Sequence, residues 1–243
     1  MVSRPSLFIK SLLKFLIRTF VLTFVCIKNI QRMLQIQGFV FNFASENTYV
    51  LYNENKKAWL FDPGNRNEEE TKALETFIRE KELTLEKILL THAHIDHVLG
   101  LQWASDTYQV PVTMHKDDRE VLDMFQMSGM RFGMQLEPVN VEINYVNEGD
   151  ELDFDGEKFK IYHVPGHSPG SVVYHNENQK FMISGDVLFE GSIGRTDLFK
   201  GNYEQLIDGI KTKLLILDDD TKVLSGHGNP TTIGFEKEHN PFF

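Results

Sequence analysis

The stretch Thr91-His92-Ala93-His94-Ile95-Asp96-His97 places three imidazoles and a carboxylate within six residues. It follows the short apolar run Ile88-Leu89-Leu90, which predicts a buried strand, and it precedes Leu99, Leu101 and Trp103, which suit the start of a helix. A turn from a strand into a helix can present these side chains for binding. Because neutral imidazole and carboxylate bind zinc and its divalent neighbours, the stretch predicts part of a metal site.

Partners for this stretch are expected in three further turns, each of which follows an apolar run and is flanked by Gly or Pro. The turns carry His167 in Val164-Pro165-Gly166-His167-Ser168-Pro169-Gly170, Asp186 in Ser184-Gly185-Asp186, and His227 in Ser225-Gly226-His227-Gly228. Gly and Pro allow the backbone to turn sharply and to present one side chain. These turns therefore offer the donors that residues 91–97 lack.

In this order the motifs resemble the metallo-β-lactamase superfamily, over about residues 33–243. The resemblance implies an α+β fold, a four-layer αββα sandwich with the metal site at one edge of its two sheets. It also implies two divalent metal ions, zinc first, with iron or manganese as alternatives. The resemblance implies that His92, His94 and His167 bind one ion and that Asp96, His97 and His227 bind the other. Asp186 would bridge the two ions.

Within the superfamily, the chain looks like the compact, single-domain glyoxalase II-like hydrolases. Only sixteen residues follow His227, which leaves no room for the helical C-terminal domain that holds glutathione in full-length glyoxalase II enzymes. The resemblance implies hydrolysis of a thioester such as a 2-hydroxyacyl-glutathione. A hydroxide bridging the metals would be the nucleophile, and Asp96 would orient it.

A second enzyme class shares much of the pattern. Persulfide dioxygenases resemble the same chain, including Gly194-Arg195-Thr196-Asp197, and hold one iron through two His and one Asp, here His92, His167 and Asp186. Such a triad suits oxygen chemistry. A metal-binding scaffold without activity is a third hypothesis, which the presence of all seven ligands disfavours.

Arg195 has two interpretations. It lies nine residues after Asp186 on a Gly-rich loop, where relatives place a cation that contacts the carboxylate of the substrate. Alternatively, Arg195 pairs with Asp197, two residues further on. Both interpretations stay open at the level of the sequence.

Charge is distributed unevenly along the chain. The formal net charge is −10, but residues 1–32 contain six basic residues and no acidic residue, so residues 33–243 carry −16. An acidic domain argues against the nucleases of the superfamily, because polyanionic substrates need a basic surface. We expect a small-molecule thioester as substrate and no nucleic-acid partner.

The only cysteine, Cys26, precedes the expected catalytic domain. Residues 33–243 therefore have no disulfide, no thiolate nucleophile and no sulfur ligand, which favours a reducing compartment, and we expect the cytoplasm. The cysteine ligand used by one large group of true β-lactamases in the superfamily is also missing. Antibiotic hydrolysis is thus disfavoured.

The chain divides into a basic hydrophobic leader, residues 1–32, and a catalytic domain, residues 33–243. Basic residues 10, 14 and 18 would share one face of a helix suited to a membrane surface, so we expect membrane contact only if the leader is translated. The apolar run between Arg18 and Lys28 has nine residues, whereas a membrane span needs about 20. The alternative is that translation starts at Met33.

Hydrophobic periodicity predicts the remaining elements. Expected are strands at 34–43, 48–52 and 58–61, a helix at 67–83, strands at 139–146, 158–164 and 171–174 that form the second sheet, and a helix at 203–217. The Met- and Phe-rich stretch from His115 to Glu137 is either ordinary helix packing, which we favour, or a lid or substrate wall beside the metals. His163 is either a residue that supports the metal ligands or a structural one, whereas His115, His175 and His239 are expected to be structural or on the surface.

Overall fold

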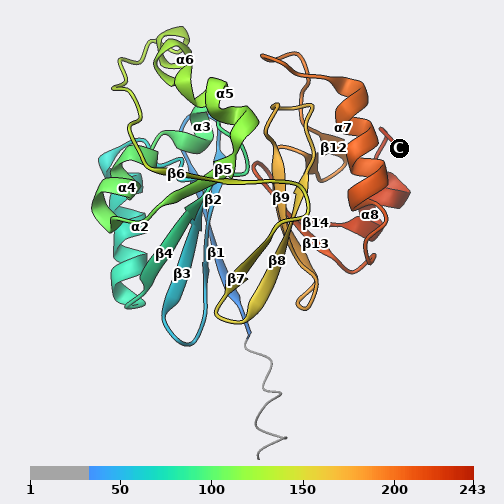
Figure 1. Cartoon of the computed structure of the whole chain (residues 1–243), viewed down its shortest axis with the longest axis horizontal. Helices are drawn as coiled ribbons and strands as arrows, with labels where there is room; N and C mark the ends of the chain where they lie inside the picture. Colours follow the sequence, from blue (N-terminus) through green and yellow to red (C-terminus); the bar gives the residue numbers. More distant parts are fainter. Residues whose placement is uncertain (1–32) are drawn as a thin grey trace, which may run out of the picture. The chain divides into compact units, whose positions relative to one another are not determined.

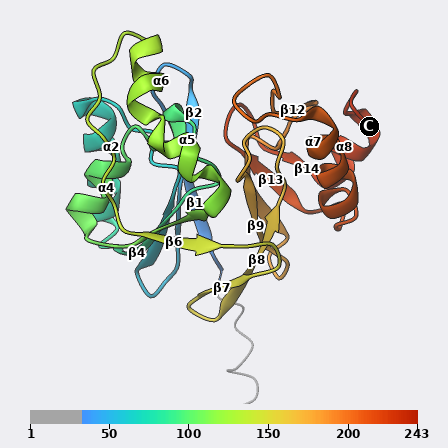
Figure 2. The same ribbon diagram turned by 45° about the horizontal axis from the view of Figure 1, so that its top comes forward.

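The computed structural model describes residues 33–243, so the predictions for residues 1–32 lie outside the described residues. In the described part, two six-stranded sheets lie face to face, and helices cover the outer side of each sheet (Figures 1 and 2). The predicted αββα sandwich is confirmed. Within residues 33–243, none of the helices is both long enough and apolar enough to cross a membrane.

The first sheet has the strand order β1-β2-β3-β4-β5-β6. An antiparallel meander, β1 to β3, continues into strands that all pair in parallel. Helices α2 (Glu68–Glu80) and α4 (Leu101–Tyr108) lie on its outer side (Figure 1). The strands are β1 (Gln35–Phe41), β2 (Glu46–Tyr52), β3 (Lys57–Phe61), β4 (Thr84–Leu89), β5 (Val112–His115) and β6 (Ile143–Val146).

The second sheet has the order β14-β13-β10-β9-β8-β7, and only β10 and β13 pair in parallel. On its outer side lie α7 (Tyr203–Gly209), which continues as a π-helix (Ile210–Leu214), and α8 (Ile233–His239) (Figure 1). A small hairpin, β11 (Leu188–Phe189) and β12 (Ser192–Ile193), follows β10. The strands are β7 (Glu151–Phe154), β8 (Glu157–His163), β9 (Val172–Asn176), β10 (Phe181–Gly185), β13 (Lys222–Ser225) and β14 (Thr231–Thr232).

Three apolar layers hold the sandwich together, and strand β3 shows how its sequence serves two of them. Ala58 and Leu60 pack toward the outer helices, whereas Trp59 and Phe61 pack between the sheets. Successive side chains of a strand point to opposite faces, so a strand covered on both faces must be apolar throughout. Lys57 is the only residue of β3 that is not fully buried.

The prediction that residues 139–146 belong to the second sheet was wrong. Only Ile143–Val146 forms a strand, and this strand, β6, pairs with β5 at the edge of the first sheet. The sequence analysis did not predict β5, whose four residues are too few for a clear pattern. Alternation predicts that a strand forms, but the neighbour of the strand depends on contacts between distant segments.

Core packing explains part of the stretch from His115 to Glu137, and another part of the stretch lines a cavity. After a short 3₁₀ turn (Lys116–Asp118), it forms α5 (Arg119–Asp123) and α6 (Phe125–Arg131), which lie at the same end of the sandwich as α3 (Ile95–Val98) (Figure 1). Val121 and Phe125 are buried in the core, as ordinary packing requires. Met127 and Phe132, however, are 52% and 56% exposed, and both line a cavity.

Candidate metal centre

The seven predicted ligands come together at one edge of the sandwich, where strands from both sheets end. His92 and His94 follow β4, and Asp96 and His97 lie on α3. His167 follows β8, Asp186 follows β10, and His227 follows β13. Two of the loops depend on glycine. Gly185 has a φ of +50°, and an added Cβ at Gly226 would lie 2.7 Å from His97 and overlap the Asp186 carboxylate.

His92, His94 and His167 form the first group, in which one ligand atom of each lies within 4.8 Å of the others. His94 Nδ1 and His167 Nε2 are 2.8 Å apart, and the three rings stand nearly perpendicular to one another, at 79° to 89°. His92 Nε2 is buried and has no hydrogen-bond partner among the described residues. A buried polar atom is costly unless something binds it, so these imidazoles fit a metal ion.

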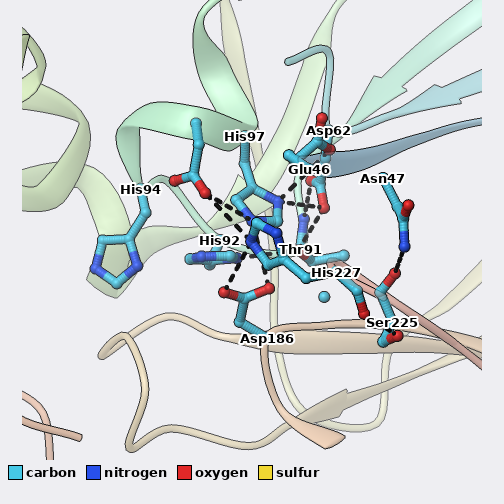
Figure 3. Close-up of polar contacts among 12 residues, drawn as sticks. Glu46, Asn47, Asp62, Thr91, His92, His94, His97, Asp186, Ser225 and His227 are labelled. Carbon is cyan, nitrogen blue, oxygen red and sulfur yellow. Dashed lines mark hydrogen bonds and ion pairs between the residues drawn. The ribbon is translucent and has the colours of Figure 1, made fainter. Parts of the chain in front are cut away.

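Asp96, His97 and His227 form the second group. His227 Nε2 lies 3.2 Å from Asp96 Oδ2, and His97 Nε2 lies 3.8 Å from the same oxygen. Asp186 contacts ligands of both groups. Its Oδ1 is 3.4 Å from His97 Nε2, and its Oδ2 is 3.5 Å from His227 Nε2 (Figure 3). Its Oδ2 is also 3.4 Å from His167 Nε2. One carboxylate thus lies between two groups of donors.

The two groups differ in electrostatics. Burial and neighbouring imidazoles hold the pKa of His92 well below its usual value and lower the pKa of His94 to about 3. Burial alone would also lower the pKa of His97 and His227, but the carboxylates of Asp186 and Asp96 raise the first well above its usual value and the second to about 10. The second group therefore attracts positive charge, which a divalent cation supplies more strongly than a proton.

Residues 42–227 match the protein family described as the metallo-beta-lactamase superfamily. The chain belongs to this superfamily. Hydroxyacylglutathione hydrolase GloC of Haemophilus influenzae is 38% identical to it over 199 residues, which cover 81% of this chain and 92% of that protein. The His and Asp donors described above imply divalent metal ions, and the chain is a metal-dependent hydrolase of the superfamily.

Two solved structures of the superfamily fold are especially similar to this chain. The crystal structure of the BLEG-1 B3 metallo-beta-lactamase superimposes with a TM-score of 0.79 at 38% identity and covers 86% of this chain and 99% of that one. The crystal structure of TTHA1623 in a di-iron-bound form has a TM-score of 0.76 at 31% identity and covers 85% of this chain and 100% of that one. Both matches extend over most of the described domain.

Asp62 and Glu46, which the sequence analysis did not assign to the site, support His97 from behind. Asp62 is buried, accepts hydrogen bonds from Thr91 N (2.7 Å) and Thr91 Oγ1 (2.6 Å), and lies 3.1 Å from His97 Nδ1. Glu46 Oε1 lies 3.8 Å from the same nitrogen, so His97 lies between these acids and Asp186 (Figure 3). Partners on Nδ1 leave Nε2 for a metal. Asp62-Pro63-Gly64 has the strand-end form of the other site turns, and this signal could have identified it.

Asp118 was also missed, and it joins the loops of two ligands in the first group. Its buried carboxylate accepts hydrogen bonds from Ala93 N (2.6 Å), Ser168 Oγ (2.6 Å) and Gly170 N (2.5 Å). These partners adjoin His94 and His167. In the sequence, Asp118 belongs to a charged run that resembles an exposed surface segment, so no local signal marks it.

His163 and His115 lie beside this support. Their rings stack face to face, with centroids 3.8 Å apart at 17°, and His163 Nε2 lies 2.9 Å from the Pro169 carbonyl oxygen. Together with Asp117 they form another group that could hold a cation. However, the nitrogen lone pairs of an imidazole lie in the plane of its ring, and the planes of two stacked rings are parallel, so the lone pairs do not point toward a common ion. Packing therefore explains the pair. His163 thus steadies the loop that carries His167.

Arg195 contacts the site through its backbone. Its carbonyl oxygen lies 2.8 Å from His167 Nδ1, whereas its guanidinium donates two hydrogen bonds of 2.7 Å to the Asp197 carboxylate. The side chain of Arg195 is therefore paired with Asp197, as the second interpretation predicted. Because Arg195 also lines the cavity, its predicted contact with a substrate stays a prediction.

A cavity of about 620 Å³ opens onto the metal centre. Several predicted ligands line it, including His94, Asp96 and Asp186. The rest of the lining comes mainly from the turn after β1, from α5 and α6, and from the β11–β12 hairpin and the loop that follows it, and it is largely apolar. The reactive bond of a molecule bound in this cavity would lie next to the metal centre.

Proposed function

We propose that the chain is a binuclear metal-dependent hydrolase that cleaves thioesters such as 2-hydroxyacyl-glutathione. The observation that carries this proposal is the position of Asp186 between two groups of three donors each. A shared anion between two neighbouring cations is the arrangement that two-metal hydrolysis uses. The similarity to a hydroxyacylglutathione hydrolase over 81% of the chain supports the substrate class.

The proposed ligands are those of the two groups, with Asp186 shared between them. The set consists of His92, His94 and His167 for one ion and Asp96, His97 and His227 for the other. When bound, the ions lower the pKa of a water molecule toward about 7 and polarise the substrate carbonyl. Zinc suits these nitrogen and oxygen donors, and iron is the alternative, because a similar protein was crystallised in a di-iron form.

The side chains of the site have separate tasks in this proposal. Asp96 faces the cavity next to His227 Nε2, where its carboxylate can accept a hydrogen bond from the attacking water and orient it. Asp186 supplies the shared negative charge. The leaving thiolate needs little help, because a thiol has a pKa of about 8.5, so the site requires no general acid.

We further propose a small-molecule substrate, no nucleic-acid partner and a cytoplasmic location. The formal charge of −16 on residues 33–243 supports the first two points, because a polyanion would be repelled. The lack of cysteine in the same residues supports a reducing compartment.

A paired assay distinguishes this proposal from the one-iron dioxygenase. Zinc-loaded and iron-loaded preparations would be tested for thiol release from lactoyl-glutathione and for oxygen uptake with glutathione persulfide. We expect thiol release, and two metal ions per chain by elemental analysis. Oxygen uptake without thioester cleavage in either metal form would favour the dioxygenase, and a single ion at saturating metal would exclude the binuclear assignment.

Asp96→Ala tests the role of the orienting carboxylate. A dioxygenase triad of His92, His167 and Asp186 does not include Asp96, whereas the binuclear hydrolase uses it directly. We expect Asp96→Ala to abolish thiol release, because it removes both a proposed metal ligand and the group that orients the attacking water. Asp106→Ala, which removes an exposed acid from α4, is the control with the same change in charge and should retain activity.

A further inference from the structure

The cavity over the metal centre is walled by large apolar side chains from separate segments of the chain. They belong to the turn after β1, to α5, α6 and their flanks, and to the β11–β12 hairpin and the loop after it, and include Phe43, Met124, Met127, Phe132, Phe189 and Phe199. A 2-hydroxypropionyl group is small and carries a hydroxyl, so it cannot fill this wall. An alkyl or aromatic group would bury both its own surface and that of the wall.

Several of these side chains are exposed around the cavity. Phe43, Met127, Phe132 and Phe199 are 44%, 52%, 56% and 44% exposed, and the rings of Phe43 and Phe132 lie 4.8 Å apart. Apolar groups that gather at the surface mark a binding site, whereas single exposed ones need no explanation. Because this group surrounds a cavity that ends at the metal centre, a substrate is the occupant that fits it.

Two arginines line the cavity, and they differ in their partners. Arg195 donates two hydrogen bonds to the Asp197 carboxylate, which neutralises it. Arg131, at the end of α6, has no ion pair and no side-chain hydrogen bond to any residue in 33–243. The acids that line the cavity, Asp96 and Asp186, belong to the metal centre. Arg131 is thus available to bind an anion.

We infer that the site selects thioesters that join an apolar acyl group to a thiol bearing a carboxylate, and that Arg131 binds this carboxylate. The inference rests on the proposed function, because the scissile carbonyl must lie at the metal centre. In the same cavity, Met127 and Phe132 offer an apolar surface to the acyl group, and Arg131 offers a cation to the thiol carrier. A guanidinium suits a carboxylate because it can donate two parallel hydrogen bonds.

The acyl group is tested with hexanoyl-glutathione and lactoyl-glutathione on the metal-loaded full chain. We expect kcat/KM to be at least ~10-fold higher for the hexanoyl thioester, because its methylene groups leave water. Met127→Ala should remove most of this preference, because it should lower kcat/KM for the hexanoyl thioester more than kcat/KM for lactoyl-glutathione. Met130→Ala is the matched control, because Met130 lies on the same helix, is 70% exposed and is not among the residues lining the cavity, so it should change neither value.

The carboxylate contact is tested with Arg131→Met, which keeps an apolar stem. We expect KM for hexanoyl-glutathione to rise ~10-fold with kcat nearly unchanged, the signature of lost uniform binding. The hexanoyl thioester of N-acetylcysteamine, which lacks a carboxylate, should be unaffected. Arg119→Met removes the same charge from a residue that pairs with Asp123 and does not line the cavity, and it should leave KM unchanged.

Binding of thioethers separates this inference from the hydrolase activity. S-hexylglutathione, which cannot be hydrolysed, should bind at least ~10-fold more tightly than S-methylglutathione in calorimetry, and Arg131→Met should weaken it ~10-fold. Equal affinities for the two thioethers, or an unchanged affinity in Arg131→Met, would overturn the inference. Tight, Arg131-dependent binding without cleavage of any thioester would instead reject the proposed activity alone.

Discussion

The pKa values of His97 and His227 are shifted in the opposite direction from those of His92 and His94, although all four are candidate ligands of one site. Asp186 and Asp96 raise the pKa of the first two, whereas burial lowers the pKa of the others. A histidine must be neutral to bind a metal. We therefore expect metal binding to displace protons from the second group rather than from the first.

The first prediction is that metal binding at pH 7 releases protons, because the carboxylates of Asp186 and Asp96 raise the pKa of His97 and His227. Since the metal-free pKa of His227 is raised to about 10, apparent affinity should rise with pH until that value and fall as the pH drops. Calorimetry in buffers of different ionisation enthalpy measures the protons. His227→Gln should release fewer protons, and a heat that is independent of the buffer would contradict the prediction.

At the scale of elements, short helical segments position the metal ligands. The helix α3 has only four residues and depends on its surroundings: Asn42 Nδ2 donates to the Asp96 carbonyl oxygen (2.9 Å), and Asp62 lies behind His97. The 3₁₀ turn ends at Asp118, which accepts hydrogen bonds from the loops that carry His94 and His167. The ligands are thus held by neighbouring elements rather than by their own segment.

Asp118→Asn should destabilise the protein by about 1.5–3 kcal/mol, the range for a buried hydrogen bond to a charged group, because the amide cannot accept all three donors. We also expect weaker metal retention, since the loops of His94 and His167 lose their common support. Urea unfolding and elemental analysis measure these effects. Asp117→Asn, at a half-exposed neighbour, is the control and should change neither. Full metal occupancy in Asp118→Asn after dialysis would contradict the supporting role.

At the scale of the whole molecule, the metal centre lies where the two sheets are joined by hydrogen bonds. Asn47 N donates to the Gly226 carbonyl oxygen (2.7 Å), Tyr49 Oη to that of Ser225 (2.7 Å), and Val172 N to that of Thr91 (2.8 Å). These bonds link β2 and the loop after β4 to elements of the second sheet. Ions held by ligands from both sheets would add to this connection.

Metal removal should therefore lower the stability of the entire sandwich. An ion present at 100 times its Kd stabilises the folded state by ~2.7 kcal/mol, so chelator-treated protein should unfold at a clearly lower urea concentration. Trp59, fully buried between the sheets, provides the fluorescence signal. Asp186→Asn should show a smaller difference between metal-loaded and chelated samples. The same midpoint for both samples of the unmodified protein would contradict the prediction.

The sequence by itself determined the chemistry of the site and the architecture that holds it. The ligand types, their places after apolar runs and the flanking glycines predicted a metal site at strand ends. These features are local, because adjacent positions determine the residue types and the backbone conformation of a turn. The αββα sandwich was expected from the resemblance of the ordered motifs to a known superfamily. The fold prediction is confirmed, and the seven predicted ligands lie together.

Only the tertiary structure decided which distant residues support and complete the site. Asp118 resembles a surface acid in the sequence, yet it is buried by two loops that begin far from it along the chain. The edge strand β6 was assigned to the wrong sheet, and the unpaired arginine of the cavity proved to be Arg131, because Asp197 holds Arg195. In each case the contact joins side chains or strands that are distant in the sequence, and packing determines which of them pair. Periodicity along the chain does not predict such contacts.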